Sequence, residues 1–155
     1  MELHFLADRV EAVPVVARWY FNKWGHRIEG NSFENTCEKI RGMLNRERPP
    51  LHIVAVEQCQ ILGVARFMLR EMDGYPHREH WLGGVYVAPY ARRAGIAAKL
   101  VLRIVEIARS YGAKELYLQT ERTDGGLYAR LGWMPLERTH YQGVDVLVMV
   151  KKLTP

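Results

Sequence analysis

The chain is poor in cysteine and has no long apolar run. Only Cys37 and Cys59 are present among 155 residues, so we expect no disulfide framework and a reducing, cytoplasmic location. Because no run of about 18 apolar residues occurs, no membrane span and no membrane partner are expected. The N-terminal stretch has no basic segment followed by an apolar one, so we also expect no secretion signal.

The sequence also lacks the motifs of several common catalytic and nucleotide-binding sites. Neither of its two serines, Ser32 and Ser110, lies in a Gly-x-Ser-x-Gly segment, which excludes that kind of serine hydrolase. There is no Gly-x-Gly-x-x-Gly segment and no Walker loop. His77-Arg78-Glu79 is similar to the His-x-Glu of zinc deaminases, but no Pro-Cys-x-x-Cys follows, so we expect no metal site.

Composition and charge indicate an ordinary globular protein. With 155 residues, 48% of them hydrophobic and 25% charged, we expect one domain over residues 1–155. The net charge of +5 favours anionic partners, and it is equally compatible with simple solubility. Because the basic residues are scattered and not interleaved with aromatic residues, we expect no nucleic-acid partner.

The hydrophobic periodicity predicts an α/β fold with one mixed sheet and helices on both faces. The longest apolar stripe predicts a helix over residues 94–111, and if this helix is a crossover, the strands on either side of it are parallel. We expect strands over residues 3–6, 51–56, 61–69, 81–87, 115–120, 133–140 and 144–152, and helices over residues 9–24, 32–44, 94–111 and 124–131.

The stretch from Val85 to the start of the long helix has the features of an anion site. Pro89 cannot donate to a sheet ladder and ends the apolar strand before it. The first N–H groups of the following helix have no acceptor within the helix, and the helix dipole favours negative charge there. Arg92 and Arg93 add positive charge, and Gly95 leaves room for a close approach. The residues therefore predict a pyrophosphate or another polyanion at this turn.

Two segments resemble one family. Arg92-Arg93-Ala94-Gly95-Ile96-Ala97 resembles the Arg/Gln-x-x-Gly-x-Gly/Ala signature of the GNAT superfamily of acyl-CoA N-acyltransferases. Residues 126–133, Gly-Leu-Tyr-Ala-Arg-Leu-Gly-Trp, resemble the family's Tyr-x-x-x-Gly-Phe/Trp segment, and they follow at the expected separation. The resemblance implies the GNAT fold, a central mixed and mostly antiparallel sheet with a β-helix-β crossover that binds CoA. It also places the two N-terminal helices beside the acceptor cleft, so Trp19, Tyr20 or Trp24 could line that cleft.

The resemblance implies acetyl-CoA as the acyl donor. Its pyrophosphate would lie on the N–H groups at the start of the long helix, and strands 85–87 and 118–120 would splay apart around the pantetheine arm. Main-chain groups of β-strand residues Tyr86 and Val87 would bind that arm, and an N–H near Val85 would polarise the thioester oxygen. The expected cofactor-binding residues are Val85, Tyr86, Val87, Arg92, Arg93, Ala94, Gly95, Ile96, Ala97, Thr120 and Tyr128.

The resemblance further implies direct attack of an amine on the acetyl group, which needs an acid and a base. Tyr128 matches the family's usual acid, although it could also only pack against the donor. Glu71, Asp73 and Glu79 lie in the polar segment 70–80 that would face the amine, and we take Glu71 and Glu79 as candidate bases, acting through water. The alternative for each of them, which is favoured for any single one, is a solvated loop charge.

The function predicted is therefore transfer of an acetyl group from acetyl-CoA to a primary amine in a ternary complex. The alternative is a sensor module that binds acyl-CoA without transfer, and the presence of Tyr128 favours catalysis. The segment 70–80 carries both signs of charge and does not select between a polyamine, an aminoglycoside, an amino acid and a protein N-terminus. By analogy with the family, the protein would be a monomer or a homodimer.

Overall fold

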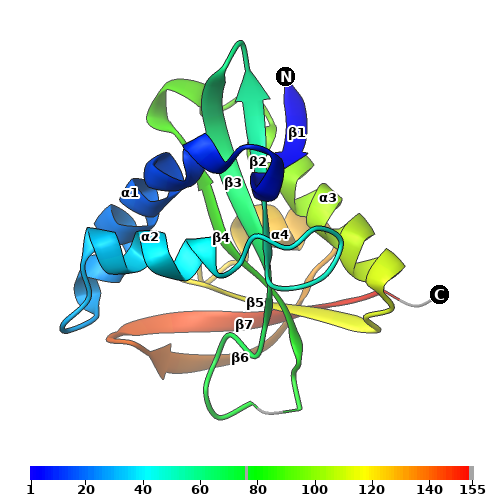
Figure 1. Ribbon diagram of the computed structural model, residues 1–155. Helices are drawn as coiled ribbons and strands as arrows, with labels where there is room; N and C mark the ends of the chain where they lie inside the picture. The colour runs from blue at the N-terminus through cyan, green and yellow to red at the C-terminus, as the bar shows by residue number, and fades with distance from the viewer. Residues whose placement is uncertain (76, 154–155) are drawn as a thin grey trace.

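The computed structural model describes residues 1–75 and 77–153, and its centre is a seven-stranded sheet with helices on both faces (Figure 1). The strand order is β1-β2-β3-β4-β5-β7-β6, and only the β4–β5 pair is parallel. The strands are β1 (Glu2–Phe5), β2 (Leu51–Glu57), β3 (Gln60–Leu69), β4 (His80–Val87), β5 (Glu115–Thr120), β6 (Met134–Tyr141) and β7 (Val144–Lys152). The predicted α/β class and mixed, mostly antiparallel sheet are confirmed.

The four α-helices of the described residues lie where they were expected, with shorter ends. The first was expected from Arg9 but begins at Val13, because Pro14 fits only the first turn of a helix, where its missing N–H costs no hydrogen bond. Ser32 caps the second helix by accepting the Asn35 N–H at 3.0 Å. The helices are α1 (Val13–Lys23), α2 (Phe33–Arg41), α3 (Ile96–Tyr111) and α4 (Gly126–Arg130).

The helices near the predicted motifs also begin later than the sequence suggested. Helix α3 was expected to begin at Ala94, but it begins at Ile96 because Gly95 has a φ of 74°, in the left-handed region. Helix α4 begins at Gly126, whose N–H donates to the Asp124 side chain at 2.9 Å. Both helix starts therefore depend on a backbone turn, and hydrophobic periodicity in the sequence does not indicate such a turn.

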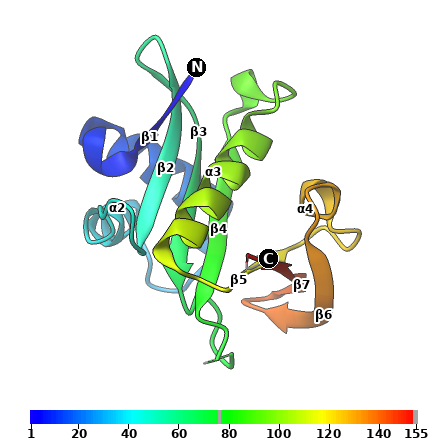
Figure 2. The ribbon, with the colours of Figure 1, turned by 90° about the vertical axis from the view of Figure 1, so that its right-hand side faces the viewer.

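The sheet has a separate apolar layer on each face. Helix α3 covers one face, and α1 and α2 cover the other, over the strands near the N-terminus (Figure 2). On the α1–α2 side, the half of the sheet formed by β5 and β7 packs instead against Met72 and Tyr75 of the segment between β3 and β4. Pro76, in the same segment, lies outside the described residues. No helix of the described chain is both long and apolar enough to span a bilayer.

The β4 and β5 strands separate soon after they meet. Their ladder contains a single pair, Trp81 with Tyr117, and Figure 2 shows β5, β7 and β6 turning away from β4 beyond it. A bulge in β4 marks the same place: Val64 pairs with Tyr86 and Arg66 pairs with Gly83, so two β4 residues lie opposite one β3 residue. The splayed strands predicted from the sequence are therefore present.

Candidate active site

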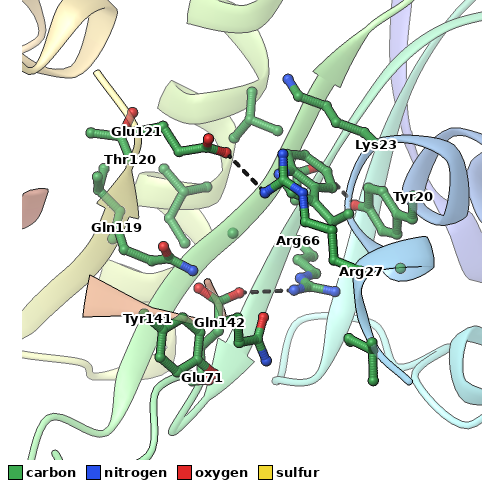
Figure 3. A pocket seen from close by; sticks show the side chains of 18 of the residues that line it. Tyr20, Lys23, Arg27, Arg66, Glu71, Gln119, Thr120, Glu121, Tyr141 and Gln142 are labelled. Atoms are coloured by element: carbon green, nitrogen blue, oxygen red, sulfur yellow. Dashed lines mark hydrogen bonds and ion pairs between the residues drawn. The ribbon is translucent and has the colours of Figure 1, made fainter. Parts of the chain in front are cut away.

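A cavity of about 490 Å³ lies where β4 and β5 separate (Figure 3). Leu82 and Val85 line it from β4, and Leu118 and Thr120 line it from β5. Side chains of α1, α2 and the segment before β4 form the opposite wall, with Tyr141 near the β6–β7 turn. A cavity of this size is large enough for a small-molecule ligand.

The turn between β4 and α3 exposes main-chain donors. The first hydrogen bond within α3 runs from the Lys99 N–H to the Gly95 carbonyl at 3.2 Å. The N–H groups of Ile96 and Ala97 therefore have no acceptor within the helix. Residues 92–95 are exposed, whereas the Ile96 side chain is buried in the core and holds the start of the helix against the sheet. The turn can therefore bind an anion through main-chain N–H groups without a change in the fold.

One β4 residue, Val87, directs its main-chain N–H and C=O into the space between the strands. The Ala88 N–H donates to the Leu62 carbonyl at 2.9 Å, so by the antiparallel alternation the N–H and C=O of Val87 point away from β3. The Val87 carbonyl accepts the Arg92 Nε–H at 3.0 Å. The same alternation directs the main chain of Tyr86 toward β3, and its ring packs against Trp19 with centroids 5.2 Å apart.

Glu71 is held over the β4 bulge by an ion pair. Its Oε1 lies 2.9 Å from the Arg66 Nη2, and only 10% of the Glu71 side chain is exposed. A Cβ atom on Gly83 would overlap the Glu71 carboxylate, so this strand position must be glycine for the carboxylate to lie there. Figure 3 shows the pair on the cavity wall. The arrangement places a partly buried carboxylate beside the point where the strands separate.

The bulge is also held from α1. The Tyr20 hydroxyl donates to the Gly84 carbonyl at 2.8 Å, and Tyr20 is buried. Gly84 has a φ of 55°, and a Cβ atom there would overlap the Tyr20 hydroxyl. Burial raises the pKa of Tyr20 above its usual range; the Arg66 charge opposes this effect and the Glu71 charge adds to it. The hydroxyl therefore stays protonated and remains a donor.

Tyr128 reaches the cavity from α4. Its ring packs edge-on against Trp133, with centroids 6.2 Å apart, and its carbonyl accepts the Trp133 N–H at 3.0 Å. Burial, with a smaller contribution from the Glu71 charge, raises the pKa of Tyr128 to about 12. The Tyr128 hydroxyl therefore keeps its proton at neutral pH and can act as a proton donor.

Comparison with known proteins assigns the chain to a family. The model of the acetyltransferase (GNAT) family matches residues 14–133, which is more than half of the chain. The chain belongs to the GNAT family. The predicted family and the class of acyl-CoA-dependent N-acetyltransferase are confirmed. No curated protein sequence matches this GNAT chain.

Solved structures share the fold over nearly the whole length. An aminoglycoside 6'-acetyltransferase type Ii is 18% identical, with a TM-score of 0.75, and the match covers 100% of this chain and 99% of that one. A ribosomal-protein-alanine N-acetyltransferase from Brucella melitensis is 23% identical, with a TM-score of 0.75 and coverage of 99% and 100%. An aminoglycoside 6'-N-acetyltransferase complexed with coenzyme A is 17% identical, with a TM-score of 0.75 and coverage of 100% and 98%.

The structure brings some of the predicted site residues of this GNAT protein together and separates others. Glu71, Val85, Thr120 and Tyr128 all line the cavity. Glu79 does not line it: the side chain is exposed and its Oε1 lies 3.3 Å from Arg70 Nη2. Asp73 is also exposed and outside the cavity lining. Of the two candidate bases, only Glu71 lies at the cavity.

The predicted residues of the β4–α3 turn divide by what their side chains do. Ile96 anchors the helix, Gly95 forms the left-handed turn, and Arg92 binds the Val87 carbonyl. Arg93 and Ala94 are exposed, and Ala97 is half-buried in the first turn of α3. Tyr86 was expected to contact the donor through its main chain, but its pairing with Val64 directs those groups to β3.

Several residues of the cavity were not predicted individually. Arg66 is one of these, and the signal for it was an arginine inside the otherwise apolar strand 61–69. The adjacent glycines Gly83 and Gly84 in an apolar strand were a signal of close approach to the backbone. Tyr20 was one of three aromatic residues considered for the cleft, and Tyr141 had no signal. Among the described residues, no group of three or more His, Cys, Asp or Glu side chains could hold a metal.

Proposed function

We propose that this protein transfers an acetyl group from acetyl-CoA to a primary amine by direct attack, with both substrates bound together. The observation that carries the proposal is the cavity at the separation of β4 and β5, which Glu71 and Tyr128 both line. An acid and a base on the walls of one cavity are what such a transfer requires. One similar structure, an aminoglycoside 6'-N-acetyltransferase complexed with coenzyme A, supports the choice of donor.

The β4–α3 turn is the proposed site for the phosphates of the donor. The free N–H groups at the start of α3 would bind the pyrophosphate, and the exposed Arg93 would add charge. The Val87 N–H, which points away from β3, would donate to the pantetheine arm or to the thioester carbonyl. When bound, acetyl-CoA supplies the acetyl group as a reactive thioester.

Glu71 is the proposed base. The incoming amine is protonated in neutral solution and must lose a proton before it can attack. The Glu71 carboxylate is held at one end by Arg66, which fixes its direction and leaves carboxylate lone pairs for a proton, taken directly or through water. The Tyr141 hydroxyl donates to the Glu71 carbonyl at 3.2 Å and also fixes this residue.

Tyr128 is the proposed acid. As the C–S bond breaks, sulfur receives the electron pair, and the Tyr128 hydroxyl would deliver a proton to it. The pKa of about 12 means that Tyr128 is protonated and ready for this step at any physiological pH. The nitrogen gives up its second proton to solvent as the amide forms. Of the two protons that the ammonium loses, one in net replaces the proton that Tyr128 gives to sulfur, and the other is released to solvent.

The test is CoA release with a panel of primary amines, together with mass detection of the acetylated amine. Binding of acetyl-CoA is measured on the same protein by calorimetry. The proposal predicts CoA release that depends on the amine and produces one acetylated product for each CoA. Tight binding of acetyl-CoA with no release for any amine would contradict the proposal and favour a sensor module.

A further inference from the structure

The cavity of the proposed acetyltransferase carries an excess of positive charge. Two carboxylates line it, and five basic side chains do so: Lys23, Arg27, Lys39, Arg66 and Arg122. The basic residues come from α1, α2, β3 and the segments that follow α1 and β5. The charge is thus not a local basic run of the sequence but a set that the fold brings to one cavity.

Ion pairs account for both carboxylates of the lining. Glu71 pairs with Arg66 at 2.9 Å, and Glu121 pairs with Arg27 at 3.4 Å; Figure 3 shows both pairs. Arg122 pairs with Asp124, outside the lining, at 3.0 Å. Each carboxylate of the described lining is therefore already paired with an arginine. The lining has no additional carboxylate to balance the charge of a cationic ligand.

The other two basic residues of the lining are lysines that take part in none of these ion pairs. In the chain from 1 to 75 and from 77 to 153, neither Lys23 nor Lys39 has a carboxylate within ion-pair distance. The Lys23 Nζ lies 4.9 Å from the centroid of the Trp24 ring and 5.5 Å from that of Tyr86. Burial and the neighbouring Arg92 lower the pKa of Lys23, although Glu121 opposes the effect. An anion beside Lys23 would stabilise its charged form and so offset the effects of burial and of Arg92.

We infer that the acceptor of this enzyme carries a carboxylate in addition to its amine. The inference rests on the proposed function and narrows its acceptor class to an acidic amino acid or an acidic peptide N-terminus, and away from polyamines and aminoglycosides. The amine would lie at Glu71, beside the point of transfer, and the anionic group would lie toward Lys23 or Lys39. A polycationic acceptor would meet the same two lysines as like charges.

The first experiment compares kcat/KM for acceptors matched in size. The pairs are C-terminally amidated tripeptides that begin with Asp-Asp or Asn-Asn, and L-glutamate against L-glutamine; spermidine and kanamycin are the cationic acceptors. We expect a preference for the more anionic member of at least one pair of about tenfold, as for one charge-assisted contact. The peptide and amino-acid pairs distinguish the two sources of the anionic group.

The second experiment removes the two lysine charges in Lys23→Gln/Lys39→Gln. The preference for the anionic member should fall to within about twofold, because the basic side chains that then remain in the described lining, Arg27, Arg66 and Arg122, are each paired with a carboxylate. Lys114→Gln is the matched control, since Lys114 is exposed and outside the cavity, and it should keep the preference. The KM for acetyl-CoA should not change with the acceptor pair used.

The outcomes separate the inference from the function on which it rests. Turnover that is equal within each pair, or faster with spermidine and kanamycin, overturns the inference and leaves the transferase proposal intact. A loss of acetyl-CoA affinity in the double lysine variant, with the acceptor preference kept, also overturns it, because the lysines would then serve the donor. If no amine releases CoA, the proposed function fails and the inference fails with it.

Discussion

The two sides of the β4–β5 separation are built in different ways. On the α3 side, the proposed donor site consists mainly of main-chain groups, the N–H groups of the first turn of α3 and the Val87 N–H, and Arg93 adds charge. On the α1–α2 side, the proposed acceptor site consists of side chains from distant parts of the chain, such as Tyr20, Glu71 and Tyr141. A donor that is common to a family suits main-chain recognition, whereas an acceptor that differs between members suits side chains that can change.

The difference also determines how each side depends on the sequence. A main-chain site needs a turn of fixed shape, so it depends on glycine and proline at short spacing, as at Pro89 and Gly95. A side-chain site needs groups that meet only after folding: the Arg66–Glu71 pair, the Tyr20–Gly84 hydrogen bond and the Arg27–Glu121 pair. Mutations on the two sides should therefore give different kinetic phenotypes.

The largest expected effect is on the acceptor side. Glu71→Gln removes the proposed base without changing its size, and we expect kcat to fall about 10²- to 10³-fold, the usual contribution of general base catalysis. Binding of acetyl-CoA, measured by calorimetry, should change less than about threefold, since the donor site is main-chain. Glu79→Gln is the matched variant at an exposed acid outside the cavity. If Glu79→Gln lost as much activity as Glu71→Gln, the assignment of the base would be wrong.

The second effect concerns stability and pH. Burial, then the Arg66 charge, lowers the pKa of His52 to about 3, and His52 is fully buried beside the Tyr20 ring. Below pH 6.5 the unfolded chain binds a proton there that the folded chain does not, so stability falls as pH falls toward 3, by about 1.4 kcal/mol per unit.

Urea unfolding at pH 6.5 and at pH 4.5 checks this prediction. The wild type should lose about 2–3 kcal/mol more between these two values than His52→Leu does. His77→Leu, at an exposed histidine, should behave as the wild type does. The same loss in all three proteins would mean that His52 does not contribute to the acid sensitivity of the fold.

The third effect is on the donor side and should appear in binding rather than in kcat. Reversal of both charges in Arg92→Glu/Arg93→Glu should weaken acetyl-CoA binding about 10- to 30-fold, because two favourable charges near a polyanion become unfavourable. Gly95→Leu should also weaken binding, through side-chain bulk and left-handed strain. Arg48→Glu/Arg138→Glu reverses two exposed charges elsewhere and is the control. Unchanged acetyl-CoA affinity in both turn variants would disprove the donor site.

The smallest effect tests the support of the β4 bulge. Tyr20→Phe removes a buried hydrogen bond to the Gly84 carbonyl, and we expect a loss of about 1 kcal/mol in the free energy of unfolding. Tyr90→Phe removes the same kind of bond, to the Ile61 carbonyl at 2.7 Å, from a residue that is 61% exposed. Denaturant titration should show a smaller loss for Tyr90→Phe. Equal losses would mean that the Tyr20 bond gives the bulge no special support.

The comparison of the two sides also explains what the sequence could predict. The order of the strands and helices followed from hydrophobic periodicity, and the donor turn followed from a motif of adjacent residues. The β4 bulge could not be predicted in this way. Gly83 and Gly84 indicate that another group approaches the strand closely, but they do not indicate that the groups are Glu71 and Tyr20. The starts of α3 and α4 were misplaced because left-handed turns at Gly95 and Gly125 leave no periodic signal.

The residues of the acceptor side could not be predicted from the sequence, and there is a physical reason for this. Glu71 and Glu79 are both acidic and belong to the same segment, yet one is held by Arg66 and the other pairs with exposed Arg70. Only the fold determines which arginine each carboxylate meets. For the same reason the net charge of the whole chain, +5, did not show that one cavity is lined by two lysines, neither of which has a carboxylate within ion-pair distance among the described residues.

The most direct test of the account is kcat of Tyr128→Phe at saturating acetyl-CoA and amine, with the acetyl-CoA Kd measured on the same protein. Tyr128 comes from α4, lines the cavity that both sides share, and loses only its hydroxyl in this variant. The account predicts that kcat falls about 10²-fold or more while the Kd stays within about threefold, since the donor site keeps its main-chain groups. A kcat equal to that of the wild type would contradict it.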